Sequence, residues 1–267
     1  GLPRGGFSPD GAIILTTSED RRAHLWSAAT DKELPRPPIR DFFGWSGIHQ
    51  QFSPDSTKLL TRVDLNTLRI WDATTGEPIG HPLQHDHKVA FCSFSADGRL
   101  IASGCEDNQA RVWDSATGEL RFAFLHDGSV NHAAFSPDRR VLATACTDGL
   151  VRFWDLTSGK LLPKPLEHRH GVDSLSWSPE GNRLLTKSWD NSVEVWDTEE
   201  RKPLGLPITH TVEVFNTSFN PDGRRLTTVS GGNLLRLWDA DTGELIVPSL
   251  RHGDWRHEAR AASDGVS

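Results

Sequence analysis

The spacing between two aromatic landmarks is constant along this chain. A Phe or Trp that opens a Ser-Pro-Asp-Gly-like turn is followed, 19 residues later, by a tryptophan. The pairs are Phe7 and Trp26, Phe52 and Trp71, Phe94 and Trp113, Phe135 and Trp154, Trp177 and Trp196, and Phe219 and Trp238. All variation in the 41- to 45-residue period falls between a tryptophan and the next aromatic. This fixed spacing predicts a repeat protein whose length-tolerant loops follow each tryptophan.

Within each repeat the pattern is typical of short β-strands. In Val141–Asp155, two runs rich in β-branched and aromatic residues flank a Thr-Asp-Gly turn. The strands are apolar on both faces, which suits small sheets packed between neighbours. A second turn follows each tryptophan and carries glycine in four repeats. Repeats 1 and 5 have Asp31 and Arg201 there, so we expect those two turns to differ.

These residues resemble the WD40 repeat family, in a bacterial-type array. Repeat 1 has Trp26-Ser27, and the other five carry the Trp-Asp pair outright, at Trp71-Asp72, Trp113-Asp114, Trp154-Asp155, Trp196-Asp197 and Trp238-Asp239. The resemblance implies an all-β chain: a β-propeller with six four-stranded WD40 blades over residues 1–251. We expect residues 252–267 to be the degenerate start of a further repeat, eroded or truncated, or else a tail.

The expected seventh repeat depends on one histidine. His252 lies nine residues before Ala261, where the next aromatic anchor is due. Replacing a core Phe by Ala typically costs about 3–5 kcal/mol, which suggests erosion. The chain has no methionine, so we expect it to be a fragment of a longer protein. Whether six blades close into a ring, or leave open edges that self-associate, is left undecided by the sequence.

In the WD40 family a His, a Ser or Thr, an Asp and the Trp form a buried hydrogen-bonded set, so the resemblance implies such sets here. Repeats 3, 4 and 5 carry every member: His85, Ser103, Asp107 and Trp113; His126, Thr144, Asp148 and Trp154; His168, Thr186, Asp190 and Trp196. Repeat 2 lacks the His and Asp, and repeat 6 lacks the Asp. Since a net hydrogen bond contributes about 1 kcal/mol, we expect blades 2 and 6 to be looser.

Composition and motifs argue against intrinsic chemistry. The net charge of −7 and pI of about 5.9 disfavour a nucleic-acid binder, and no apolar run approaches the length of a membrane span. Three cysteines without metal spacing predict buried free thiols in a reduced compartment. His85-Asp-His87 and His168-Arg-His170 lack a third ligand, so we expect no metal, no cofactor and no enzyme activity. We assign the arginines two residues before tryptophans to the blade surface: Arg69, Arg111, Arg152 and Arg236.

Residues that break the repeat on loops are the candidates for binding. In the WD40 family one face is formed by the His-bearing loops and the turns before the Asp. The candidates on that face are Trp189, Phe215, Trp45, Asp173, Glu106 and Asn131. Exposed aromatics anchor interfaces, and Glu106, Asp173 and Glu213 add negative charge around them. The alternative is that Trp189 folds down on its own blade and that Trp45 packs blade 2.

The sequence therefore predicts a cytoplasmic, non-catalytic scaffold that presents a propeller face to a protein or peptide partner. A slightly basic peptide with aromatic or Leu side chains would match the acidic face. The alternative is a sensor or substrate-docking region of a larger bacterial serine/threonine kinase or other effector enzyme. A propeller enzyme with a site in the channel is a third possibility, but no set of ionisable residues supports it.

Overall fold

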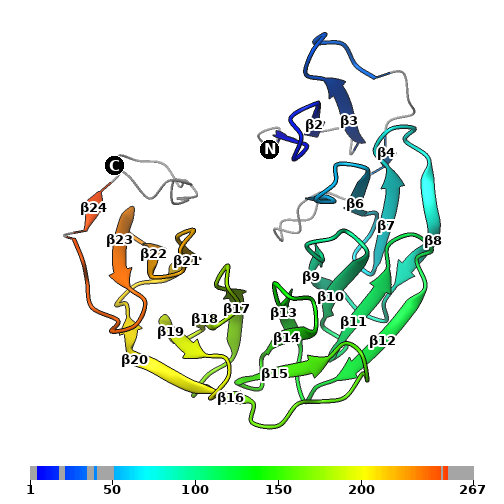
Figure 1. Ribbon diagram of the computed structural model, residues 1–267. Coiled ribbons are helices and arrows are strands. Elements are labelled where there is room, and N and C mark those ends of the chain that lie inside the picture. Colours follow the sequence, from blue (N-terminus) through cyan, green and yellow to red (C-terminus); the bar gives the residue numbers. More distant parts are fainter. Residues whose placement is uncertain (1–4, 18–21, 35–38, 41–50, 248, 252–267) are drawn as a thin grey trace. The chain divides into compact units, whose positions relative to one another are not determined.

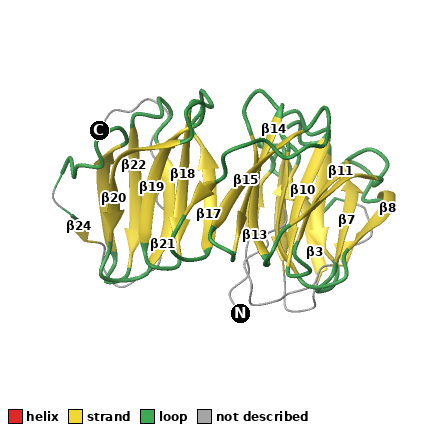
Figure 2. Cartoon of the chain, turned by 90° about the horizontal axis from the view of Figure 1, so that it is seen from below, coloured by secondary structure: helices red, strands yellow, loops and turns green. Residues whose placement is uncertain are grey.

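The computed structural model describes residues 5–17, 22–34, 39–40, 51–247 and 249–251. These residues form strands, turns and loops, with no helix among them (Figure 2). The chain divides into two compact units, Gly1–Val130 and Asn131–Ser267. The expected seventh repeat at 252–267 and the candidate Trp45 lie outside the described residues.

In the first unit, the described residues form three antiparallel four-stranded sheets, which we call blades 1 to 3 (Figure 1). Within each blade the strands follow one another in chain order. Blade 1 contains β1 (Gly5–Phe7), β2 (Ile13–Thr17), β3 (Arg22–Ser27) and β4 (Ile39–Arg40); blade 2 contains β5 (Gln51–Phe52), β6 (Lys58–Arg62), β7 (Thr67–Asp72) and β8 (Pro78–Gln84); blade 3 contains β9 (Val89–Phe94), β10 (Leu100–Cys105), β11 (Gln109–Asp114) and β12 (Leu120–Leu125).

The second unit contributes three more four-stranded sheets, blades 4 to 6, from its described residues. Blade 4 contains β13 (Val130–Phe135), β14 (Val141–Cys146), β15 (Leu150–Asp155) and β16 (Leu166–Glu167); blade 5 contains β17 (Val172–Trp177), β18 (Arg183–Ser188), β19 (Ser192–Asp197) and β20 (Lys202–Thr209); blade 6 contains β21 (Val214–Phe219), β22 (Arg225–Ser230), β23 (Leu234–Asp239) and β24 (Leu250–Arg251). The expected all-β architecture of four-stranded blades is confirmed for the described residues.

The register explains the constant spacing between aromatic anchors. In blade 4, β14 and β15 pair around a turn that contains Asp148, and Leu142 lies opposite Trp154. The hairpin expected from the Val141–Asp155 pattern is therefore confirmed. Since the Ser-Pro-Asp turn and the two strands that follow it have nearly the same length in every repeat, each tryptophan falls at the same place on its third strand.

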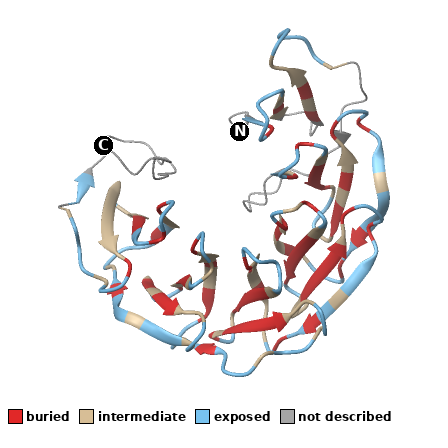
Figure 3. Ribbon diagram, viewed as in Figure 1, coloured by how far each residue is buried: buried red, intermediate tan, exposed pale blue. Residues whose placement is uncertain are grey.

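The apolar faces of neighbouring blades pack against each other within each unit. One cluster joins Leu68 and Ile70 of blade 2 to Val89 and Ile101 of blade 3. Figure 3 shows the buried residues concentrated in the inner strands, whereas the outer strands β8, β12 and β20 are largely exposed. The other buried clusters likewise join residues of two neighbouring blades. Burial of one such side chain contributes about 1.5–3 kcal/mol, so packing between blades is a main source of stability within each unit.

Blades 2 and 6, which we expected to be looser, differ in how deeply their strand residues are buried. In blade 2 the strand residues Leu59, Leu60, Leu68 and Ile70 have no exposed surface. In blade 6, by contrast, every residue of β23 is only partly buried. Loss of the His and Asp from repeat 2 therefore leaves its apolar packing intact.

The turns of repeats 1 and 5 do not differ in backbone, and that expectation was wrong. Asp31 and Arg201 adopt positive φ angles of 55° and 58°, close to the 73° of Gly76 at the same position. The Arg201 N–H also donates to the Asp197 carbonyl, as the Gly76 N–H does to Asp72. The repeat thus imposes the left-handed conformation on residues that adopt it at an energetic cost. In compensation, the Arg201 guanidinium lies 3.6 Å from the Phe153 ring centroid.

Candidate functional site

In blade 3 the Trp, Ser and His of the expected set form a directed hydrogen-bond chain, which does not include Asp107. The Trp113 indole N–H donates to Ser103 Oγ at 2.9 Å, and Ser103 Oγ lies 2.8 Å from His85 Nε2. His85 Nδ1 is 3.0 Å from the Asn66 carbonyl oxygen, so Nδ1 carries the proton and Nε2 accepts from the serine hydroxyl. Burial, followed by the nearby Arg111 charge, lowers the pKa of His85 to about 4. The imidazole is therefore neutral at pH 7.

The corresponding contacts differ among blades 4 to 6. In each, the tryptophan donates to the Thr hydroxyl: Trp154 to Thr144 at 3.0 Å, Trp196 to Thr186 at 2.9 Å and Trp238 to Thr228 at 2.9 Å. His126 Nδ1 is 2.9 Å from the Phe124 carbonyl oxygen. In blade 6, His210 Nε2 lies 2.9 Å from Thr228 Oγ1, so the chain forms without the Asp.

Blade 5 departs from the expected set at its histidine. His168 is buried, and neither ring nitrogen makes a hydrogen bond to the described residues. Its ring packs edge-on against Trp196 at 5.3 Å, and Nδ1 is 3.3 Å from the Glu194 carboxylate, in an ion-pair rather than a hydrogen-bond geometry. The structure thus brings His168 to Trp196 but does not bond it to Thr186.

The aspartates of the expected sets pair with arginines or with their own turn. The Arg111 guanidinium lies 2.7 Å from Asp107, and the Arg152 guanidinium lies 2.6 Å from Asp148. Both arginines are buried, so their assignment to the blade surface was wrong. Since the two residues of each pair are four apart across a tight turn, their side chains meet. Burial works to raise the pKa of Asp107, but contacts with the Arg111 guanidinium, the Cys105 thiol and the Asp86 N–H together outweigh it, and the pKa is lowered. In blade 5, Asp190 bonds to Ser192 of its own turn.

The thiols are buried and unreactive. Cys92, Cys105 and Cys146 are free of disulfides and buried, as expected. Burial raises the pKa values of Cys105 and Cys146 to about 11, so both stay protonated at neutral pH. Within the part of the chain that the structure describes, no three His, Cys, Asp or Glu side chains are grouped to hold a metal ion. The same part contains no helix that is long and apolar enough to cross a membrane.

A pair of loop residues recurs at one end of several blades. The turn residue that lies seven positions before the tryptophan donates its backbone N–H to a carbonyl oxygen. That oxygen belongs to the residue three positions after the His of the same repeat. We call these two residues a loop pair. Glu106 bonds in this way to Lys88 at 3.0 Å, Trp189 to Gly171 at 2.9 Å, and Gly231 to Glu213 at 2.9 Å. The backbone contact is constant while the side chains vary, so function can vary there without disturbing the blade.

In blade 5 the loop pair presents an aromatic ring to solvent. The Trp189 side chain is 58% exposed. Its ring nevertheless rests on the backbone of Gly171, where a Cβ would lie 2.9 Å from Cε3. The indole is therefore supported by its own blade and exposed to solvent at the same time, and its role as a partner contact stays a prediction.

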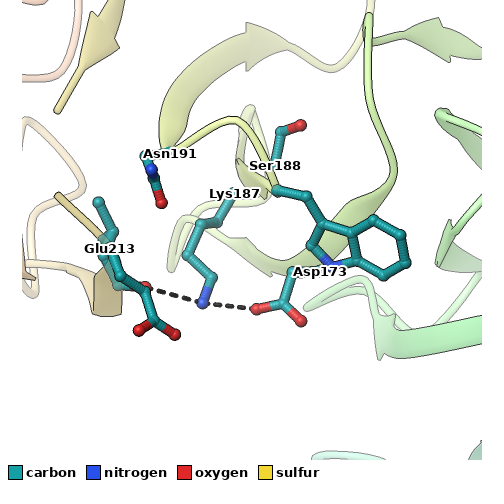
Figure 4. Close-up of a pocket in the computed structure, with 7 residues that line it drawn as sticks. Asp173, Lys187, Ser188, Asn191 and Glu213 are labelled. Carbon is teal, nitrogen blue, oxygen red and sulfur yellow. Dashed lines mark hydrogen bonds and ion pairs between the residues drawn. The ribbon is translucent and has the colours of Figure 1, made fainter. Parts of the chain in front are cut away.

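A polar pocket of about 290 Å³ lies beside Trp189. Lys187 extends across it, and Nζ lies 2.5 Å from Asp173 Oδ2 and 3.1 Å from the Val214 carbonyl oxygen (Figure 4). Asp173 and Glu213 lie on opposite sides of this ammonium group (Figure 4). The Glu213 carboxylate forms no hydrogen bond or ion pair with the described residues. The remaining lining residues are Ser188 and Asn191.

The other candidates lie near the pocket or elsewhere. Phe215 follows the lining residue Val214 on β21 and is 42% exposed. The Asn131 side-chain amide donates to the Val172 carbonyl oxygen at 2.9 Å, so it links blades 4 and 5. Glu106 belongs to the first unit and forms an ion pair of 2.8 Å with Lys88. The structure thus brings Trp189 and Asp173 into one pocket and places Phe215 next to its wall.

Sequence reasoning missed Lys187. The equivalent position holds Gly104 in repeat 3 and Ala145 in repeat 4, both small, and a cation there breaks the pattern. Arg62 is the equivalent cation of repeat 2, and its guanidinium donates to the Val89 carbonyl oxygen at 3.3 Å. A charged residue at an otherwise small or apolar strand position was the signal that could have revealed both side chains.

The fold and the repeated turns define a repeat protein built from four-stranded β-blades. The family model described as WD40 (WD domain, G-beta repeat) matches residues 5–27, 76–114, 118–155, 159–197 and 201–239. These stretches cover more than half of the chain, which therefore belongs to the WD40 repeat family. The unmatched segment between residues 27 and 76 contains most of repeat 2, whose His and Asp positions are substituted. A search of the curated proteins finds no match.

Proposed function

We propose that this chain is a non-catalytic scaffold that binds a protein or peptide through the loop face around Trp189. WD40 repeats generally mediate protein–protein interaction, and the proposal assigns that role to named residues here. The single observation that carries it is the exposed Trp189 indole beside a polar pocket. Aromatic side chains of this kind are enriched among interface anchors.

The chemistry of the pocket defines the kind of partner. Asp173 and Glu213 give the face an acidic character, and Phe215 adds a second exposed aromatic ring. A basic peptide that carries an aromatic or Leu side chain complements both features. The acidic balance of the whole chain argues against nucleic acid as the partner. The free thiols support a reduced compartment such as the cytoplasm.

Two further uses belong to the same proposal. In a larger bacterial kinase or other effector enzyme, the same face would dock the substrate or sense a signal, and the sequence of the whole gene distinguishes that case. Self-association would use open blade edges. The mass in solution, measured by light scattering, tests self-association directly.

The central experiment selects peptides that bind the chain and measures how much Trp189 and Phe215 contribute to their affinity. Random heptapeptides displayed on phage are selected against the unmodified chain, and dissociation constants are measured for the recovered peptides by calorimetry. We expect Trp189→Ala to weaken binding at least tenfold, as loss of an interface anchor does, and Phe215→Ala to weaken it severalfold. Leu206→Ala is the matched control, because Leu206 is 80% exposed on the outer strand β20. Unchanged affinity in both aromatic variants would remove the proposed face.

A further inference from the structure

The pocket beside Trp189 has more negative than positive charge. The Lys187 ammonium is bound by Asp173 at 2.5 Å and by the Val214 carbonyl oxygen at 3.1 Å. Asp173 and Glu213 flank this single ammonium from opposite sides (Figure 4). Two carboxylates around one cation leave one net negative charge, and that charge resides on the exposed Glu213 side chain.

Comparison with blade 3 shows what is different about Glu213. In blade 3 the loop pair is Lys88 and Glu106, whose side chains neutralise each other at 2.8 Å. In blade 6 the residue paired with Glu213 is Gly231, which has no side chain to offer. Blade 6 thus presents a carboxylate at a position where blade 3 supplies its own counter-ion. A cation from outside the chain can take that role.

Trp189 adds an aromatic surface to the lining of the same pocket. The close approach of its ring to Gly171 supports the indole from below and leaves more than half of the side chain exposed. A cation over an indole face gains about 0.5–1 kcal/mol at an exposed site. The pocket volume of about 290 Å³ lies just below the roughly 300–1,000 Å³ of small-molecule sites. One long side chain fits this pocket better than a cofactor does.

We propose that this pocket binds an arginine side chain of the partner, with the guanidinium stacked on Trp189 and paired with Glu213. This inference rests on the proposed function and names the residue that the face recognises. Arginine fits better than lysine, because a planar guanidinium stacks on an aromatic ring and pairs with a carboxylate through two parallel hydrogen bonds. Asp173 and the Val214 carbonyl oxygen hold Lys187 across the pocket.

Three tripeptide probes test the proposal: N-acetyl-Gly-Arg-Gly-amide and its lysine and citrulline analogues. Each is titrated into the ¹⁵N-labelled chain while the Trp189 indole N–H resonance, assigned from a Trp189→Phe variant, is followed by NMR. We expect the arginine peptide to shift this resonance saturably, with a dissociation constant on the order of millimolar. Citrulline has the same shape without the charge, and we expect it to bind at least tenfold more weakly, with lysine between the two.

A charge-removing variant locates the site. Glu213→Gln should weaken the arginine peptide about five- to tenfold, as expected for a lost charge-assisted contact, while Glu244→Gln, an exposed control in the same blade, should leave it unchanged. Absence of binding by the arginine peptide, equal binding of the citrulline or lysine peptide, or an unaffected Glu213→Gln variant would each overturn the arginine assignment. Heptapeptide binding that depends on Trp189 without any arginine preference would leave the proposed function standing, so the two failures are distinguishable.

Discussion

The backbone of Gly171 lies directly beneath the indole of Trp189, with 2.9 Å between ring atom Cε3 and the point that a Cβ would occupy. Real Cβ atoms essentially never approach another atom so closely, so no other residue fits without moving the ring. The same point is 3.1 Å from the Thr147 carbonyl oxygen of blade 4. Gly171 therefore fixes the height of the aromatic ring above the blade.

Substitution of Gly171 tests whether the position of the ring matters. We expect Gly171→Ala to displace the Trp189 indole and to weaken binding of the selected heptapeptides about three- to tenfold, since an anchor acts through a preorganised position. The shift of the Trp189 indole resonance reports the displacement. Gly6→Ala is the matched control, because a Cβ at Gly6 meets nothing within 4 Å. An unmoved resonance would show that the glycine is not the support.

The blades were predictable because one strong pattern repeats. The constant distance from Phe135 to Trp154 already fixes two strands and the turn between them, and the structure places both as expected. The loop pair was not predictable from the same pattern. Gly171 looks like any loop glycine in the sequence, and only the close approach of the Trp189 ring to it shows that it supports the indole. A repeat pattern defines what the copies share, whereas the site depends on contacts that one copy makes alone.

The buried arginines illustrate a different limit. The expectation of a surface position for Arg111 followed from its register in the repeat, two residues before the tryptophan, although only a paired arginine is tolerated in a buried position. Asp107 stands four residues before it, across a turn that brings the two side chains to 2.7 Å. Pairing makes burial tolerable, and the equal spacing of Asp148 and Arg152 could have indicated it. The Asp position and the Arg position recur together in these repeats, and their pairing becomes evident only when both positions are considered at once.

Blades 2 and 6 provide a matched test of the hydrogen-bond chain. Thr228 contacts both His210 and Trp238, whereas Thr61 accepts from Trp71 in a repeat that has no His. We therefore expect Thr228→Val to lower the free energy of unfolding by about 2 kcal/mol and Thr61→Val by about 1 kcal/mol, near one unit per lost bond. Urea denaturation followed by tryptophan fluorescence measures both. Equal losses would contradict the difference between the two blades.

Stability should fall in mild acid, because the fold holds His85 neutral. Its pKa is about 4 in the folded chain against an ordinary value of 6.5, so the unfolded chain binds the extra proton between these pH values. The contribution is complete above pH 6.5 and is lost as the pH falls toward 4, for a total of about 3 kcal/mol. Urea unfolding at pH 7.5, 5.5 and 4.5 measures this dependence. His85→Gln should reduce this dependence without removing it, because burial also lowers the pKa values of His132 and His210. His81→Gln, which alters an exposed histidine, should leave the dependence unchanged.

The left-handed turns of blades 1 and 5 separate backbone strain from side-chain contacts. Asp31 and Arg201 have φ angles of 55° and 58°, where glycine is favoured by about 1 kcal/mol. Asp31→Gly should therefore raise the melting temperature slightly. Arg201→Gly should not, because it also removes the guanidinium that lies 3.6 Å from the Phe153 ring and donates to the Thr198 carbonyl. We expect Arg201→Gly to be neutral or to lower the free energy of unfolding by about 1 kcal/mol. Calorimetric melting of both variants measures the contrast, and a stabilising Arg201→Gly would show that the arginine contacts contribute nothing.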